Sequence, residues 1–126
     1  MKVLLLIASA AALCLAGCSS SADSPPLAAC NQASLQTTID AFLHESQSHL
    51  DSFDKLDCSG QWALVQASVT DEGSKPAKQV FVFARSGQNW ILKAPESVCG
   101  SPSADDSRPA DAEIPADLWP QACLIP

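Results

Sequence analysis

The sequence contains 126 residues with a mass of 13.2 kDa, which is the size of one small domain. Seven Lys and Arg residues stand against 14 Asp and Glu residues, so the formal net charge is −7. Such an acidic chain argues against binding to nucleic acid or to a polybasic lipid site, because both need clustered cations. The hydrophobic fraction of 47% excludes wholesale disorder, and six cysteines in so short a chain predict export to an oxidising compartment.

The first 17 residues have the features of an export signal. Lys2 supplies a positive charge, and an apolar run begins at Val3. At about 15 residues, this run is shorter than the ~20 residues that a membrane-spanning helix needs. A buried core helix, the alternative, leaves unexplained both the charged start and the abrupt change to a Ser- and Pro-rich sequence. We therefore expect residues 1–17 to be a signal peptide.

The end of this segment, Leu15-Ala16-Gly17-Cys18, resembles the lipobox of bacterial prolipoproteins. In that family the cysteine thiol receives a diacylglyceryl group, and a dedicated signal peptidase cuts just before the cysteine. The new amino terminus is often acylated, for example with palmitate. The resemblance therefore implies cleavage between Gly17 and Cys18 and a lipid on Cys18. The alternative is an ordinary secreted protein in which Cys18 stands by chance.

A lipid anchor would place the mature protein in the cell envelope, on the outer face of a bacterial membrane, because two or more acyl chains give stable attachment. That membrane is the cell membrane, or the outer membrane where one exists. Residues 18–29 are rich in Ser, Ala and Pro and are predicted to be a flexible tether. No later apolar run approaches the length of a membrane-spanning helix.

Residues 30–126 are predicted to form one small domain stabilised by two disulfides. Its four cysteines allow three pairings. We favour the pairing of sequence neighbours, Cys30–Cys58 with Cys99–Cys123. The rival pairing, Cys30–Cys99 with Cys58–Cys123, gains if the helix after the first cysteine is long and rigid. A zinc site is disfavoured, because no two of these cysteines have the short spacing of a zinc knuckle.

An amphipathic helix is predicted over residues 32–50. Asn31 or Ser34 can cap its start. Apolar residues recur with the 3.6-residue period of a helix, and polar residues occupy the opposite face. The apolar stripe consists of Leu35, Ile39, Phe42, Leu43, Leu50 and Phe53.

Three strands are predicted after the helix, over residues 61–70, 78–85 and 89–94, with turn signals between them. Short connections of this kind join antiparallel neighbours. The predicted fold class is therefore α+β, with one amphipathic helix packed on a three-stranded antiparallel sheet. Residues 100–113 are rich in Ser, Pro and Asp and predict a mobile loop, and the apolar residues 114–119 are expected to dock back on the core.

Several short sequences of this part also resemble small exported actinobacterial domains of unassigned function. The resemblance is loose, covers most of the mature chain, and implies a fold and a disulfide pattern but no activity. It rests on Cys-Ser-Gly-Gln-Trp-Ala (58–63), Gly-Gln-Asn-Trp (87–90), Cys99, Ile-Pro (114–115) and Cys123.

The residue patterns favour no catalytic chemistry. His44 and His49 are five residues apart, so they do not share a helix face, and a solvated polar surface is the simpler interpretation of both. No nucleophile elbow and no phosphate-binding glycine loop is present. Acidic pairs at residues 71–72 and 105–106 fall in predicted turns, where carboxylates are usually solvated. We predict neither an enzyme nor a cofactor nor a metal site.

The three tryptophans allow two interpretations. If they are exposed, Trp62, Trp90 and Trp119 form a candidate binding surface for a sugar or a peptide. If they are buried, they belong to the core of the sheet, which we favour because Trp62 and Trp90 begin predicted strands.

The function predicted from these observations is a membrane-anchored lipoprotein that serves as a non-enzymatic binding or accessory module of the envelope. Its partners are the membrane, through Cys18, and an unidentified envelope protein or ligand, with no nucleic acid. One alternative is an inhibitor or exclusion factor against a cationic target such as a lysozyme, because opposite charges speed encounter. The other alternative is a small hydrolase.

Overall fold

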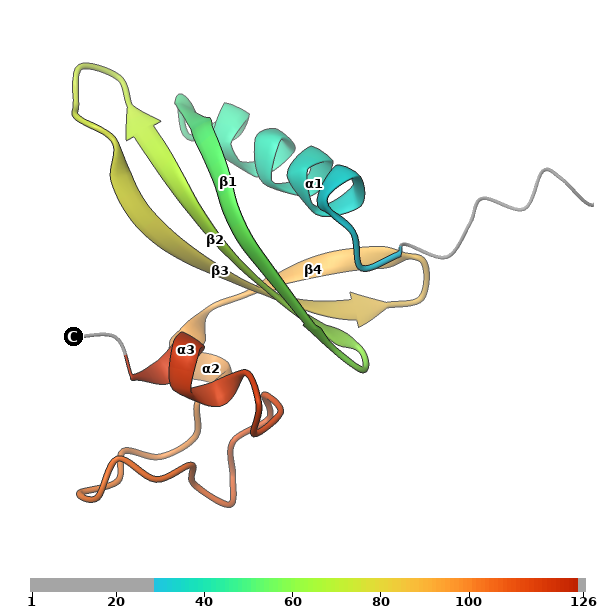
Figure 1. The fold of residues 1–126 in the computed structure, drawn as a ribbon, viewed down its shortest axis with the longest axis vertical. Helices are drawn as coiled ribbons and strands as arrows, with labels where there is room; N and C mark the ends of the chain where they lie inside the picture. The colour runs from blue at the N-terminus through green and yellow to red at the C-terminus, as the bar shows by residue number, and fades with distance from the viewer. Residues whose placement is uncertain (1–28, 125–126) are drawn as a thin grey trace, which may run out of the picture.

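The computed structural model describes residues 29–124. They form a four-stranded antiparallel sheet in the order β1-β2-β3-β4, so each strand pairs with its neighbour in sequence. One helix, α1, covers one face of the sheet, and the C-terminal segment lies against the opposite face (Figure 1). The elements are α1 (Gln32–Glu45), β1 (Ser48–Ser59), β2 (Trp62–Asp71), β3 (Ala77–Ser86), β4 (Asn89–Lys93), α2 (Pro95–Val98) and α3 (Trp119–Cys123).

Helix α1 begins where the sequence predicts and ends earlier. The Ser34 backbone N–H donates to the side-chain oxygen of Asn31 at 2.9 Å, which caps the first turn. Leu35, Ile39 and Leu43 are buried against the sheet. The helix stops at Glu45, before the left-handed residue Gln47 (φ 58°), so the predicted end at residue 50 is wrong.

The α+β class is confirmed, but the sheet has a fourth strand beyond the three predicted, because β1 occupies the last three residues of the predicted helix and the unassigned residues after it. Two β-bulges interrupt its pairing with β2, one between Leu50 and Ser52 and one between Phe53 and Lys55. Each bulge adds one residue to β1, so Leu50, Phe53 and Leu56 recur at steps of three and still face α1. A spacing of three continues the helical stripe in the sequence, which explains the error.

The other three strands lie within two residues of their predicted bounds. Residues 58–70, which include most of β2, contain no charged residue, as a central strand covered on both faces requires. Their side chains alternate between the two faces, so Ala63 and Val65 face α1 while Leu64 faces the C-terminal segment.

The sheet therefore separates two hydrophobic cores. The first lies between α1 and the sheet and centres on Phe83, which is fully buried. The second lies between the sheet and the C-terminal segment, residues 94–124. The segment supplies most of the second core, in which Ile114 and Leu118 pack with Leu64 and Val82 of the sheet. The expectation that residues 114–119 dock on the core is confirmed.

Each disulfide fastens one of these covering layers. Cys30–Cys58 joins the second residue before α1 to the end of β1, and Cys99–Cys123 joins the end of α2 to the end of α3. This is the pairing of sequence neighbours that we favour above. The rival pairing assumed a helix long enough to carry Cys58 away from Cys30, and α1 is instead followed by a strand that runs back to it.

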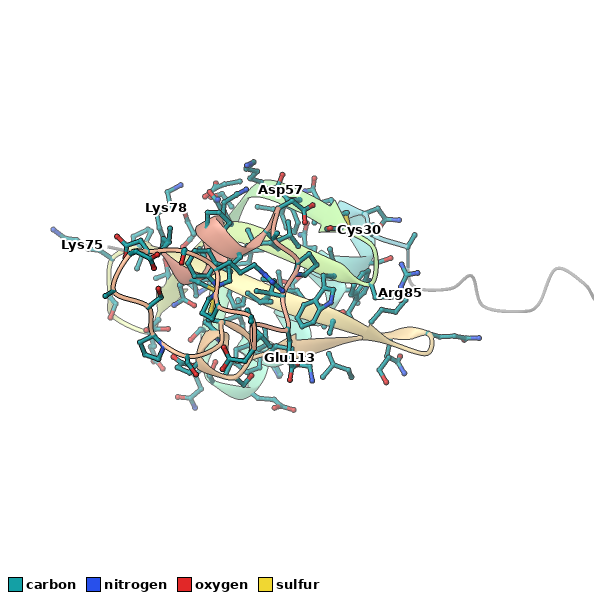
Figure 2. The ribbon with its side chains drawn as sticks, turned by 90° about the horizontal axis from the view of Figure 1, so that it is seen from below. Cys30, Asp57, Lys75, Lys78, Arg85 and Glu113 are labelled. Carbon is teal, nitrogen blue, oxygen red and sulfur yellow. A yellow bond between two sulfur atoms is a disulfide. The ribbon has the colours of Figure 1, made fainter. Side chains whose placement is uncertain are left out.

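The turns between the strands lie at two opposite ends of the sheet. The described chain begins at one end, which also holds the β1–β2 and β3–β4 turns; we call residues 59–61 and 86–89 the entry tip. The backbone N–H of Arg85 donates to the carbonyl of Gln61 at 2.7 Å, which places the two turns side by side. Cys30 and Arg85 lie at this end, and Lys75, in the β2–β3 turn, lies at the other (Figure 2).

The loop that the sequence predicts to be mobile is held by its own polar groups. The Asp111 carboxylate accepts hydrogen bonds from the backbone N–H and the hydroxyl of Ser101, the latter at 2.6 Å. The Arg108 guanidinium donates to the carbonyls of Ala112 (2.7 Å) and Ile114 (3.0 Å). These bonds close residues 101–114 into a loop that starts and ends beside the Val98 carbonyl, which accepts the Ile114 N–H.

Gly100 makes this closure possible. Gly100→Ala is expected to lower the free energy of unfolding by more than the cost of placing alanine in a left-handed backbone conformation. At φ 80°, a Cβ on this residue would lie 2.8 Å from the Ala112 nitrogen. A left-handed non-glycine residue costs about 1–2 kcal/mol, and the contact adds to that cost. Gly60→Ala is the matched control, because Gly60 has φ 56° and open space around it. Equal shifts of the urea midpoint in both variants would contradict the close approach.

Candidate functional site

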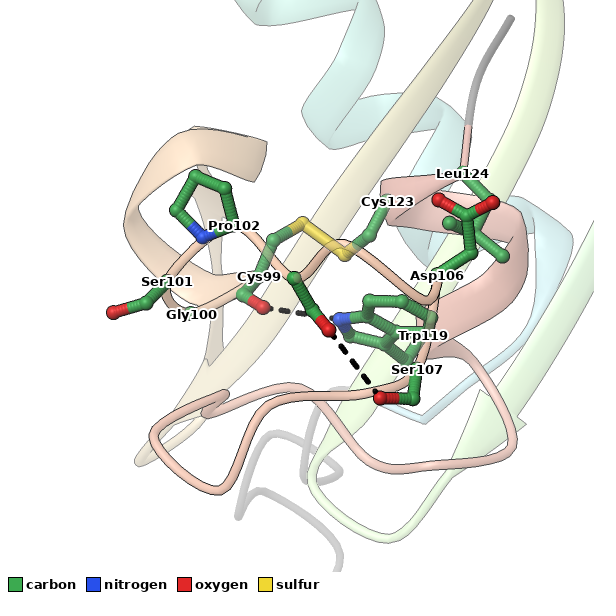
Figure 3. A pocket seen from close by; sticks show the side chains of 10 residues that line it. Cys99, Gly100, Ser101, Pro102, Asp106, Ser107, Trp119, Cys123 and Leu124 are labelled. Atoms are coloured by element: carbon green, nitrogen blue, oxygen red, sulfur yellow. Dashed lines mark hydrogen bonds between the residues drawn. A yellow bond between two sulfur atoms is a disulfide. The ribbon is translucent and has the colours of Figure 1, made fainter.

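A surface pocket of about 290 Å³ lies beside the Cys99–Cys123 disulfide, between the loop and α3 (Figure 3). One wall is the disulfide with Trp119, and the other is the polar loop that follows Gly100. Leu124 closes the rim. The polar side chains that line the pocket are Ser101, Ser103, Asp106 and Ser107.

The polar groups around this pocket are largely engaged with one another. Ser103 and Ser107 both donate to the carboxylate of Asp105, the latter at 2.7 Å. The Trp119 indole N–H donates to the Cys99 carbonyl at 3.0 Å. No histidine lines the pocket to act as a base toward these hydroxyls. The pocket therefore presents hydroxyl and carboxylate groups beside an apolar wall.

Hydrogen bonds set the charge state of the loop. Donation from the side chains of Ser103 and Ser107 lowers the pKa of Asp105 below its ordinary value. Donation from the Ser101 side chain, and then from its backbone N–H, lowers the pKa of Asp111. Both carboxylates therefore stay ionised into the acid range, and the loop keeps a negative surface.

The titration of Asp111 provides a direct test of this loop. Because its pKa is lowered on folding, its contribution to stability is present above the unfolded value of about 3.9. That contribution is lost as the pH falls through the lower folded value. Carboxyl-carbon NMR should give an Asp111 midpoint below the ordinary value for an aspartate. In Ser101→Ala the Asp111 midpoint should rise, and an unchanged midpoint would contradict the assigned hydrogen bond.

A second pocket, of about 300 Å³, lies on the other side of the same disulfide. Pro95, Glu96 and Ala122 line it together with the two cysteines. The Cys99–Cys123 disulfide thus forms a shared wall between two surface hollows. The residue patterns predict neither pocket. The one signal that points to them is the polar run of residues 100–113 between two cysteines.

The tryptophans do not form a joint binding surface. Trp90 and Trp119 are each 6% exposed, and they lie in different cores on opposite faces of the sheet. Trp62 is partly buried against the second core. The Arg85 guanidinium lies 4.9 Å from the ring centre of Trp90 and covers it further. Trp90 and Trp119 are therefore core residues, Trp62 packs at the edge of the second core, and the three rings do not share one exposed surface.

The two histidines are far from this pocket. His44 lies in the last turn of α1 and His49 near the start of β1, and both are exposed. His49 lies 3.4 Å from Asp51 of the same strand. Among residues 29–124, no three His, Cys, Asp or Glu side chains gather as a metal site requires.

Polar side chains cover the β1 edge of the sheet, on the face away from α1. Asp54, the extra residue of the second bulge, accepts from Lys78 at 2.6 Å and from Ser52 at 2.7 Å. These bonds, that from Lys78 first, lower the pKa of Asp54. Lys55 pairs with Asp57 at 2.9 Å on the same strand.

The expected lipid site lies outside the described residues, as do Gly17 and Cys18 on either side of the expected cleavage point. The structure therefore places no anchor. Within residues 29–124, no helix has the length and apolar character needed to cross a membrane.

Comparison with known proteins gives no relative. No family model matches the chain, and neither a curated protein nor a solved structure is significantly similar to it.

Proposed function

We propose that this chain is a lipid-anchored bacterial lipoprotein whose disulfide-bonded domain binds another component of the cell envelope and performs no catalysis. The observation that carries the proposal is the pair of disulfides, each of which fastens one covering layer. Such staples persist in oxidising compartments outside the cytoplasm. The lipobox-like Leu15-Ala16-Gly17-Cys18 adds the route of export and the means of attachment.

The binding role is supported by the character of the domain surface. In the loop after Gly100, carboxylates and hydroxyls form hydrogen bonds with one another. Groups held in this way present a fixed pattern of acceptors to a partner, whereas a nucleophile needs a base in contact with it. The two pockets beside the Cys99–Cys123 disulfide are the recognition site that we propose.

The anchor is tested by Cys18→Ser, expressed as the full chain in a bacterial host. This variant should lose incorporation of labelled palmitate and should leave the membrane fraction or accumulate as the unprocessed form, because no thiol remains to accept the lipid. Cys14→Ser is the matched control, since Cys14 lies in the segment expected to be removed. Unchanged labelling and fractionation of Cys18→Ser would contradict the anchor.

The binding role is tested by crosslinked capture from envelope extract with the domain, residues 22–126, read by mass spectrometry. A single dominant partner whose capture is lost in Asp106→Arg would support recognition through the first pocket. Lys75→Glu, at the opposite end of the domain, should capture the same partner as the unaltered domain. An empty capture would contradict a protein-binding role.

A further inference from the structure

The structure fixes the point at which the segment that would carry the lipid joins the domain. Cys30 is bonded to Cys58 at the end of β1. The Trp90 indole N–H donates to the Ala29 carbonyl at 3.4 Å, from the start of β4. Both contacts hold the beginning of the described chain against the entry tip, residues 59–61 and 86–89, as Figure 1 shows.

The length of the intervening chain limits how the domain can be placed relative to Cys18. Ala29 follows Cys18 by eleven residues, which span at most about 36–40 Å when fully extended. Strand β1 has 12 residues and is therefore about 40 Å long. The far end of the sheet could reach a surface at Cys18 only if the whole segment ran extended alongside the domain. A shorter segment keeps the entry tip closer to that surface and leaves too little length for the far end to point toward it.

Charge favours the same orientation. The residues of the entry tip are themselves uncharged and mostly exposed, and the Ser59 hydroxyl donates to the carboxylate of the neighbouring Asp117 at 2.9 Å. Arg85, beside the tip, is the one charged residue between positions 84 and 92. The far end carries Glu45 at the end of α1, Asp71 at the end of β2 and Glu72 in the β2–β3 turn, against Lys75 in the same turn, so its carboxylates outnumber its cations. Bacterial membranes with anionic lipid repel this net negative end more than the entry tip.

We infer that the entry tip is a membrane-facing surface, which contacts the headgroups of the bilayer that holds the lipid on Cys18. This inference rests on the proposed anchor and adds an orientation to it. The β2–β3 turn and the acidic end of α1 then point away from the membrane.

The test uses the lipidated full-length protein reconstituted into vesicles of phosphatidylethanolamine and phosphatidylglycerol that contain a headgroup spin-labelled phosphatidylcholine. A single fluorophore is placed on Gln88→Cys in the entry tip or on Ser74→Cys in the opposite turn. Both residues are exposed turn positions. Mass measurement after alkylation confirms that both native disulfides remain closed. Fluorescence at residue 88 should be lost to the spin label, and fluorescence at residue 74 should be retained.

The outcomes separate the orientation from the anchor. Equal quenching at the two positions, or stronger quenching at residue 74, would overturn the orientation. No quenching at either position in a protein that floats with the vesicles would also overturn it, while the anchor would stand. A protein that carries no lipid and does not float would overturn the anchor and the orientation together. Cys18→Ser protein, which has no thiol to accept the lipid, should show no quenching at residue 88, and quenching there would contradict a contact that depends on the anchor.

Discussion

Phe83→Ala is expected to lower the free energy of unfolding by about 3–5 kcal/mol, the range for removing a buried aromatic ring. Phe83 is 1% exposed and lies in β3, between the strands that flank it and under α1. Its ring also stacks near that of Phe81, with 6.5 Å between ring centres. The cavity would open in the middle of the first core, where the sheet and the helix cannot both move to fill it. Urea denaturation followed by circular dichroism measures the loss.

The control for this substitution is Phe42→Ala. Phe42 belongs to the apolar stripe predicted from the sequence, yet it is 46% exposed on α1. Its replacement should shift the unfolding midpoint little, because little apolar surface returns to water. Comparable losses in the two variants would show that α1 packs on the sheet through a different face.

Removal of the second disulfide is expected to have a similar effect. Cys99 and Cys123 are 24 residues apart, and closing a loop of that size in the unfolded chain corresponds to about 3.5 kcal/mol in the chain-entropy model. The double variant Cys99→Ser/Cys123→Ser should therefore lose about this much stability. It should also loosen the C-terminal segment first, because that segment meets the sheet through the second core and through few other contacts.

The matched control is Cys30→Ser/Cys58→Ser, which opens a loop of similar length at the other layer. The two variants should differ in which tryptophan responds. The Trp119 indole N–H resonance should shift when Cys99–Cys123 is absent, since its acceptor is the Cys99 carbonyl. The Trp90 resonance should shift when Cys30–Cys58 is absent, since its acceptor is the Ala29 carbonyl. The opposite assignment would contradict a separate staple for each layer.

The elements that the sequence predicts well are those whose period is undisturbed. Strands β2 and β3 are rich in β-branched and aromatic residues and end at glycine-containing turns, so the alternation fixes their bounds closely. Strand β1 is hidden because Asp51 and Asp54 are extra residues that give its apolar side chains a spacing of three. A pattern search sees a helix there, and only the pairing with β2 reveals the strand.

The candidate site is less predictable than the fold, for a physical reason. Its walls come from a loop with no periodic pattern and from the ends of two short helices, α2 and α3. Cys99–Cys123 and the bonds of Asp111 bring these parts together, and both act between residues distant in sequence. Composition suggests a mobile loop, because Ser, Pro and Asp bury little apolar surface. The hydrogen bonds that close the loop join Ser101 to Asp111 and Arg108 to Ala112 and Ile114, and composition alone does not show these partners.

The bulged strand β1 also bears on how crowded copies of this protein behave. An outer strand offers unpaired backbone groups that can template another strand, and copies confined to a membrane would meet side by side at high density. The two extra aspartates kink that border and place charge along it. A neighbouring copy therefore finds no straight, neutral border at β1, and we expect no sheet-to-sheet growth through this strand even where copies are crowded.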